Sequence, residues 1–300
     1  MFGRKMLLAA VAAAFALTST YADAGFFGHA KKPDPDDIST ALDPTIAAIQ
    51  RAIDEQRLKD AGDLLDKTLL SGAKDPRLFL LSGELDLLRG RYVEALDVLK
   101  QADTVPLTRA KALECEGIAL SMLERSDEAL AALQDAVAAD PSAWRAWDAL
   151  AGEYDRRRDW TRAEAAYDHA MNGSDGAAIV LNNRGYSRLL QGRFDAAKDD
   201  FVAALEKKPD FAAARTNLRL AMAMKGEYDR ATTAGAQDDQ AALLNNAGFA
   251  AMMRGDYTEA EALLTRAMQA KGEYYARAAQ NLDVAKALEA RQKAPPVASQ

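Results

Sequence analysis

The chain has 300 residues, of which 49% are hydrophobic and 28% are charged, so it can bury a sizeable apolar core. Its formal net charge of −7 argues against nucleic acid as a partner, because a phosphate backbone is bound by a positive surface. With a single cysteine, Cys115, the chain cannot form an internal disulfide framework.

The first 24 residues have the pattern of a secretory signal peptide. A short basic start precedes an apolar run at 6–17, and a small-residue cleavage pattern ends at Ala24. The run is shorter than the about 20 residues that a membrane-spanning helix needs. We therefore expect cleavage between Ala24 and Gly25 and a periplasmic protein, with an uncleaved start that is amphipathic or membrane-anchoring as the alternative. No lipid-accepting cysteine follows the cleavage point, so a lipoprotein is not expected.

Two segments have the composition of flexible chain. Residues 25–41 contain two phenylalanines and then a polar stretch broken by prolines, which predicts a flexible tether. Residues 292–300 have a similar composition and are predicted to be a disordered tail.

An alanine recurs along the rest of the chain at a fixed interval. Six alanines stand 34 residues apart and a seventh follows after 29, at Ala61, Ala95, Ala129, Ala163, Ala197, Ala231 and Ala260. Other features keep the same phase: small residues twelve positions earlier, such as Gly117 and Gly248, glycines five earlier, such as Gly226, and large apolar residues four later, such as Leu133. A period of this length predicts stacked helix hairpins instead of a single catalytic domain.

The same positions locate the ends of the helices. Each glycine follows a first helix where the chain needs a left-handed turn, and the apolar stripe after the alanine buries one face of a second helix. Pro141 and Pro209 end two of the second helices. The sequence thus predicts an all-α fold of about seven helix–turn–helix repeats.

These residues resemble the consensus of the tetratricopeptide repeat (TPR) family. In one repeat the match is nearly position by position, over Trp147, Leu150, Ala151, Tyr154, Ala163, Tyr167 and Ala170. The resemblance implies a TPR solenoid over 42–291 whose last helix, 273–291, caps the open end of the stack. The predicted repeats are 42–75, 76–109, 110–143, 144–177, 178–211, 212–240 and 241–274.

Two of the predicted repeats depart from the pattern. The first has Ile49 at the small position and Gln56 where the hairpin glycine belongs. The sixth lacks about five residues of its second helix, and we expect a shortened connection at 237–239.

No arrangement of residues in the sequence predicts catalysis. His29 lies in the tether and His169 on a second helix, and neither has a nucleophile, a phosphate-binding loop or metal-ligand spacing beside it. We therefore expect a protein that is not an enzyme and that has no cofactor, metal site or small-molecule substrate.

In TPR arrays the first helices line a concave groove, so the resemblance implies which side chains face a protein partner. In repeats two to four the implied positions are charged, at Arg77, Glu84, Lys111, Glu114, Arg145, Asp148, Asp155 and Arg156. In repeats five to seven they are mostly apolar, at Ile179, Tyr186, Leu189, Leu220, Met224, Phe249, Met252 and Met253. The groove is therefore predicted to change character halfway along the array.

Three asparagines take the same position in successive repeats of the apolar half, Asn183, Asn217 and Asn246. Amides at this spacing predict a ladder that pairs with the backbone of an extended, hydrophobic partner segment. The predicted binding residues are Asn182, Asn183, Tyr186, Asn217, Leu220, Met224, Asn245, Asn246, Phe249 and Met253. The alternative is that asparagine is simply common at this position in TPRs and that Leu189, Met224 and Met252 are partly core residues.

A clamp for a partner's carboxylate would need basic side chains near these asparagines. Arg219 is the nearest candidate, and the repeat register predicts that it points elsewhere. Among the three tryptophans only Trp144 lies outside the consensus core positions, which makes it a candidate contact.

The carboxyl-terminal half resembles a more specific group, the TadD family of TPR proteins, which serve the tight-adherence (Flp pilus) secretion system. The similarity extends over residues 76–290, and its most distinctive element is Tyr274-Tyr275 followed by Ala278, Asn281 and Leu282. It implies an envelope scaffold that assists assembly of the pilus or its outer-membrane secretin and that reaches the membrane only through partners. A periplasmic scaffold for outer-membrane protein assembly or polysaccharide export is the alternative.

Overall fold

The computed structural model of the chain describes residues 40–103, 105–235, 239–271 and 275–293, and in these residues every regular element is a helix. After a short 3-10 helix, η1 (Thr40–Leu42), come α2 (Asp43–Asp54), α3 (Leu58–Leu70), α4 (Pro76–Leu88), α5 (Tyr92–Ala102), α6 (Pro106–Met122), α7 (Ser126–Ala139), α8 (Trp144–Arg156), α9 (Trp160–Ser174), α10 (Ala178–Leu190), α11 (Phe194–Lys207), α12 (Ala212–Lys225), α13 (Tyr228–Thr232), α14 (Gln240–Arg254), α15 (Tyr257–Lys271) and α16 (Ala276–Lys293). The predicted signal peptide, almost all of the tether and the last seven residues lie outside the described part. None of the described helices is both long enough and apolar enough to cross a membrane.

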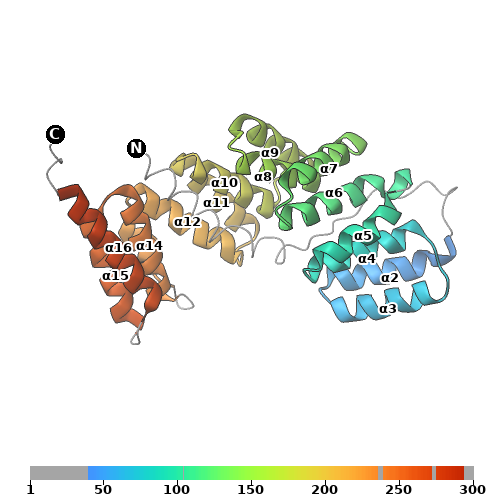
Figure 1. Cartoon of the computed structure of the whole chain (residues 1–300), viewed down its shortest axis with the longest axis horizontal. Helices are drawn as coiled ribbons and strands as arrows, with labels where there is room; N and C mark the ends of the chain where they lie inside the picture. Colours follow the sequence, from blue (N-terminus) through green and yellow to red (C-terminus); the bar gives the residue numbers. More distant parts are fainter. Residues whose placement is uncertain (1–39, 104, 236–238, 272–274, 294–300) are drawn as a thin grey trace, which may run out of the picture. The chain divides into compact units, whose positions relative to one another are not determined.

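Consecutive helices pair as hairpins in which the first helix has an even number, from α2 to α14, and the second helix an odd number (Figure 1). The closest packing lies within a hairpin, as between α6 and α7 or between α14 and α15. First helices also pack against the next first helix, as α4 does against α6 and α12 against α14. This arrangement buries one stripe of each helix, so the core forms from short local contacts.

The close contacts divide the described residues into two compact units, and the division falls within α10. We call residues 40–183 the N-unit and residues 184–293 the C-unit. The N-unit core contains a cluster around Ile49, Leu65 and Leu85, and the C-unit core one around Leu244, Leu263 and Leu264.

The periodic small residues bring the two helices of a hairpin together, as the sequence predicts. A Cβ atom added at Gly117 would lie 2.5 Å from the Leu133 side chain, and one at Gly248 would lie 2.7 Å from Leu264. The seven periodic alanines are all buried. Glycine and alanine at these positions therefore set the distance between the helices.

The predicted left-handed turns are also confirmed. Gly226 and Gly255 have φ angles of 92° and 89° directly after α12 and α14. Three hairpins make the same turn without glycine, because Gln56, Glu124 and Arg158 take φ angles of 58°, 60° and 57°. The turn is thus imposed by hairpin packing even where the residue disfavours it.

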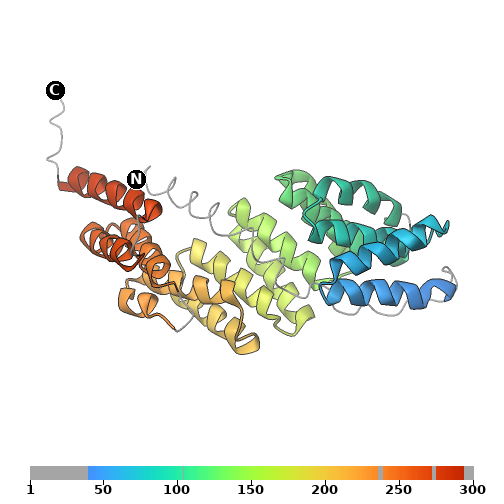
Figure 2. The ribbon, with the colours of Figure 1, turned by 90° about the horizontal axis from the view of Figure 1, so that it is seen from below.

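The C-unit contains the irregular hairpin and the terminal helix. The second helix of the sixth predicted repeat, α13, has only five residues, and two residues of its predicted connection, Gln237 and Asp238, lie outside the described part. The last helix, α16, packs along α15 and α14 (Figures 1 and 2) and buries Ala278 and Ala285. It begins at Ala276, three residues after the predicted start.

Candidate functional site

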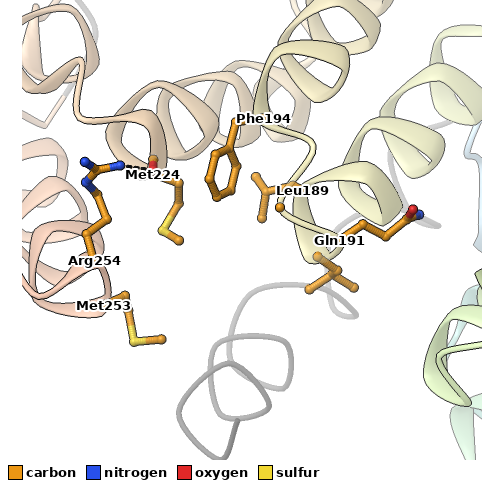
Figure 3. Close-up of a pocket in the computed structure, with 8 residues that line it drawn as sticks. Leu189, Gln191, Phe194, Met224, Met253 and Arg254 are labelled. Carbon is orange, nitrogen blue, oxygen red and sulfur yellow. Dashed lines mark hydrogen bonds between the residues drawn. The ribbon is translucent and has the colours of Figure 1, made fainter. Parts of the chain in front are cut away.

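The C-unit has an apolar pocket of about 410 Å³ at the carboxyl ends of three first helices, α10, α12 and α14. It is lined by Leu189, Leu190, Gln191, Gly192, Phe194, Met224, Met253 and Arg254. Figure 3 shows the Phe194 ring between Met224 and Leu189, while the end of the Gln191 side chain points away from them. Because methionine side chains are flexible and polarizable, this lining can adapt to apolar groups of different shapes.

Arg254, which lines this pocket, is held by its neighbours. Its Nη1 donates to the backbone oxygen of Met224 at 2.7 Å and its Nε donates to Asp256 Oδ2 at 2.9 Å. The Tyr228 hydroxyl donates to the same carboxylate oxygen at 2.6 Å, and these two donors lower the pKa of Asp256. The Arg254 charge is therefore balanced by the Asp256 carboxylate, and the pocket presents mainly apolar surface.

A smaller pocket of about 20 Å³ lies between α12, α13 and α14 of the same unit. Its lining residues are Thr216, Arg219, Leu220, Ala223, Ala231, Leu243, Asn246 and Ala247. Arg219, which the repeat register predicts to point away from the asparagines, lines this pocket together with Asn246. The α13 helix is short, and the Arg219 guanidinium donates to the backbone oxygen of Thr233 just after it, at 3.3 Å. The space suffices for one water molecule or one carbonyl oxygen.

Asn246 is held by a chain of side-chain amides. The buried Asn245 donates its Nδ2 to Asn246 Oδ1 at 3.3 Å, and Asn281 of α16 donates its Nδ2 to Asn245 Oδ1 at 3.0 Å. Among the described residues the Asn246 Nδ2 group has no hydrogen-bond partner, and Asn246 lines the small pocket. This group can donate to an acceptor that enters the pocket.

The matching pair in the N-unit is arranged differently. The buried Asn182 donates its Nδ2 to Asn183 Oδ1 at 3.2 Å, but the Nδ2 of Asn183 donates to Asp148 Oδ2 at 2.8 Å. Asn183 thus uses its donor inside the protein. Asn182 and Asn245, at 1% and 2% exposure, orient their neighbours and offer almost no surface to a partner.

The remaining predicted binding residues are half-buried. Tyr186 and Leu220 pack against the core around Phe201, and Phe249 packs against the core around Leu264. Asn217 is half-buried on α12. These side chains contribute to the core as well as to the surface.

Three predicted groove residues also belong wholly or partly to the core. Met252 and Leu189 are buried, and Met224 packs partly against the C-unit core. Leu189 and Met224 nevertheless also line the larger pocket, whereas Met252 lines neither pocket.

The charged positions predicted for the N-unit groove are largely buried, so the prediction of a mixed-charge surface is wrong for Glu84, Glu114 and Asp148. Their exposed fractions are 2%, 3% and 5%. Lys111 contacts Glu114 and lies 3.9 Å from Glu84. First helices that pack this closely shield these positions from water, and the charges then pair with one another.

Two of these carboxyl groups are incompletely paired. Glu84 Oε2 and Asp148 Oδ1 are buried and have no hydrogen-bond partner in the described part of the chain. Burial raises the pKa of Glu84 to about 7, and it raises the pKa of Asp148 to about 7 against the opposing effect of the Asn183 hydrogen bond. Both groups therefore titrate near neutral pH.

The other candidate side chains have structural partners. His169 stacks on Trp147 with ring centroids 4.3 Å apart. The Trp144 ring lies 4.3 Å from the Arg145 guanidinium carbon. The described residues hold no group of histidine, cysteine and carboxylate side chains that fits a metal ion.

Comparison with known proteins identifies the repeat. A family model of the tetratricopeptide repeat matches residues 116–177 and 182–237. These two stretches carry tetratricopeptide repeats. Together with the helices described above, this confirms the predicted all-α TPR fold with a C-terminal helix. TPR folds are typical of scaffolds that bind other proteins, and they are generally not catalytic. No curated protein matches the chain.

Two solved structures share the TPR fold at low sequence identity. A TPR protein from Parabacteroides merdae is 15% identical, with a TM-score of 0.53, over 83% of this chain and 100% of the other. A thermophilic TPR protein from Thermus thermophilus is 20% identical, with a TM-score of 0.54, over 60% of this chain and 98% of the other. At these identities the likeness supports the fold alone.

Several pocket residues are absent from the groove positions that the TPR consensus implies, namely Gln191, Gly192, Phe194 and Arg254. The consensus positions lie along the first helices, whereas this pocket is completed by the turn after α10, the first residue of α11 and the last residue of α14. One feature of the sequence could have located this pocket. Two methionines, Met224 and Met253, stand at the carboxyl ends of first helices that are followed by glycine turns.

Proposed function

We propose that the chain is a non-enzymatic TPR scaffold that binds an extended, apolar segment of a partner protein along the first helices of the C-unit. The observation that carries this proposal is an apolar pocket and an unused amide donor on the same helix, α14. An extended segment has backbone carbonyls that can accept from Asn246, and it can insert an apolar side chain among Met224, Met253 and Phe194.

The spacing along α14 gives the register of such a segment. Asn246 and Met253 are seven residues apart, so they lie on the same face and about 10 Å apart along the helix axis. An extended chain covers this distance in about three residues. The segment that fits therefore accepts a hydrogen bond at one carbonyl and carries a bulky apolar side chain about three residues away.

The cellular role is a finer proposal. We place the chain in the periplasm and propose that its partner is the outer-membrane secretin or another component of a Flp-type pilus. The signal-peptide pattern and the resemblance of residues 76–290 to TadD proteins support this role. A scaffold for outer-membrane protein assembly or polysaccharide export would use the same groove with another partner.

Affinity capture tests both parts of the proposal. The mature chain, Gly25 to Gln300, is incubated with envelope extract, beside the variant Met224→Glu and the triple variant Asn183→Ala, Asn217→Ala and Asn246→Ala. A buried, unpaired carboxylate in the pocket is unfavourable, so we expect Met224→Glu to reduce capture at least about tenfold. Met222→Glu is the matched control, because Met222 is also half-buried on α12 but does not line either pocket.

The outcomes separate the two parts. Equal capture by the parent and by Met224→Glu would refute binding in the pocket. Pocket-dependent capture of proteins unrelated to pili would retain the scaffold and refute the TadD-like role, and the captured proteins would identify the export or assembly system concerned.

A further inference from the structure

The terminal helix α16 is joined to the binding face of α14 by hydrogen bonds between side chains. Three asparagines form the connection: Asn281 on α16, Asn245 in the core and Asn246 at the small pocket. Both contacts run in one direction, with Asn281 donating to Asn245 and Asn245 donating to Asn246. An α16 that only covered the apolar end of the stack would not need this polar contact, since its packing rests on Ala278, Ala285 and apolar neighbours.

The direction of this chain decides what Asn246 offers. An amide has its acceptor oxygen and its donor nitrogen on opposite branches. Because Asn245 donates to the Asn246 oxygen, that oxygen is occupied and the nitrogen is available at the pocket. The bond from Asn281 to the Asn245 oxygen favours this orientation of the Asn245 amide, because it holds the oxygen toward α16 and the nitrogen toward Asn246. The orientation at the pocket therefore depends on a residue two hydrogen bonds away.

We propose that Asn281 is a positioning residue for the binding site: through Asn245 it holds Asn246 with its amide nitrogen toward the groove and so selects a partner carbonyl at that point. This inference rests on the proposed function for its consequence, but the orientation itself is a property of the free protein. The terminal helix is then part of the binding site as well as its cap.

The substitution Asn281→Asp tests the orientation with almost no change of shape. A carboxylate only accepts hydrogen bonds, so it would take the bond from Asn245 Nδ2 and turn the Asn245 amide round. The Asn245 oxygen would then face Asn246, which would turn its nitrogen inward and its oxygen toward the pocket. The whole chain of amides is expected to reverse.

The measurement is proton exchange with water at the side-chain amides of the ¹⁵N-labelled full chain, followed by NMR without any partner. In the parent, the Asn246 amide protons should exchange freely, and in Asn281→Asp one of them should be slowed about tenfold, as an ordinary hydrogen bond provides. The Asn183 amide is an internal reference, because it donates to Asp148 and should stay protected in every variant.

Glu289→Gln is the matched control for a general change in α16. Glu289 lies on the same helix and accepts a hydrogen bond from Thr258 of α15 at 2.9 Å, away from the three asparagines. Slower Asn246 exchange in Asn281→Asp but not in Glu289→Gln would support the proposal. Unchanged exchange in Asn281→Asp, or an equal change in both variants, would overturn it.

If Asn281→Asp does not fold, Asn245→Asp replaces it. A carboxylate at that position would accept from both Asn281 and Asn246, so the Asn246 nitrogen would again turn inward and exchange would slow. A folded Asn245→Asp variant with freely exchanging Asn246 protons would overturn the proposal. A reversal of orientation that leaves capture of the partner unchanged would refute the proposed role of Asn246 in binding and leave the positioning by Asn281 intact.

Discussion

The N-unit and the C-unit are built from the same kind of hairpin, but the side chains at its consensus groove positions have opposite roles in the two units. In the N-unit, Asp148 occupies the donor of Asn183, and Glu84 is buried among other charges. In the C-unit, the position that matches Asp148 in the repeat is Thr216, and the donor of the equivalent Asn246 remains open beside it. The N-unit uses the donor of this asparagine internally, whereas the C-unit leaves the equivalent donor for a partner.

This difference separates a structural role from a binding role within one repeat consensus. A side chain at a consensus groove position contacts a partner only when its neighbours in the adjacent repeats leave it free. We therefore expect pH to act mainly on the N-unit and partner affinity to depend mainly on the C-unit.

The largest expected effect is a loss of N-unit stability as the pH rises. Glu84 and Asp148 have pKa values of about 7 when folded and lower values when unfolded, so the folded state binds more protons between about pH 4 and pH 7. The free energy of unfolding should therefore fall as the pH rises. Between pH 5 and pH 8 the fall should be on the order of 2–3 kcal/mol for each group.

Urea unfolding followed by tryptophan fluorescence measures this effect, because all three tryptophans, Trp144, Trp147 and Trp160, lie in the N-unit. The double variant Glu84→Gln and Asp148→Asn should remove most of the dependence. If the parent chain were as stable at pH 8 as at pH 5, burial would not raise the pKa values of these two carboxyl groups.

The next-largest effect is the loss of stability when a hairpin glycine is replaced by alanine, and it should be equal in the two units. Gly117→Ala and Gly248→Ala place a methyl group against Leu133 and Leu264, and such overpacking costs roughly 1–3 kcal/mol. Gly152→Ala on α8 is the control, because its Cβ would meet no atom of the described residues within 4 Å and alanine favours a helix by up to about 1 kcal/mol. Thermal unfolding by circular dichroism measures all three. Gly117→Ala or Gly248→Ala that raised the melting temperature as Gly152→Ala does would contradict the role of these glycines.

The smallest effect is expected from a substitution that gives Asn246 of the C-unit the carboxylate partner that Asn183 has in the N-unit. Thr216→Asp introduces a carboxylate at the position of Asp148, and it should accept from Asn246 and weaken the binding of the captured partner about tenfold, the cost of one hydrogen bond. Thr216→Val keeps the shape without an acceptor and should bind like the parent. Titration calorimetry compares them, and equal affinity of all three proteins would mean that the partner does not use Asn246.

Much of the fold follows from periodic residues, while the binding site does so only in part. The spacing of Gly117 and Leu133 predicts the close helix pairs, and Gly226 and Gly255 predict left-handed turns, because these constraints act within one hairpin. The predicted groove included Met224 and Met253 but omitted Phe194, which is the first residue of a second helix, α11.

The amino-acid sequence by itself determined the repeat, the hairpin turns and the apolar character of the C-unit, since all three depend on residues a few positions apart. The tertiary structure alone decided which polar groups are available. Asn183 and Asn246 are asparagines at the same repeat position, and they differ in whether the amide nitrogen is available. Asp148 accepts from the nitrogen of Asn183, whereas Asn245 and Asn281 turn the nitrogen of Asn246 toward the pocket. Hydrogen bonds between helices of successive repeats make that choice, and their partners lie 35 or 36 residues apart along the chain.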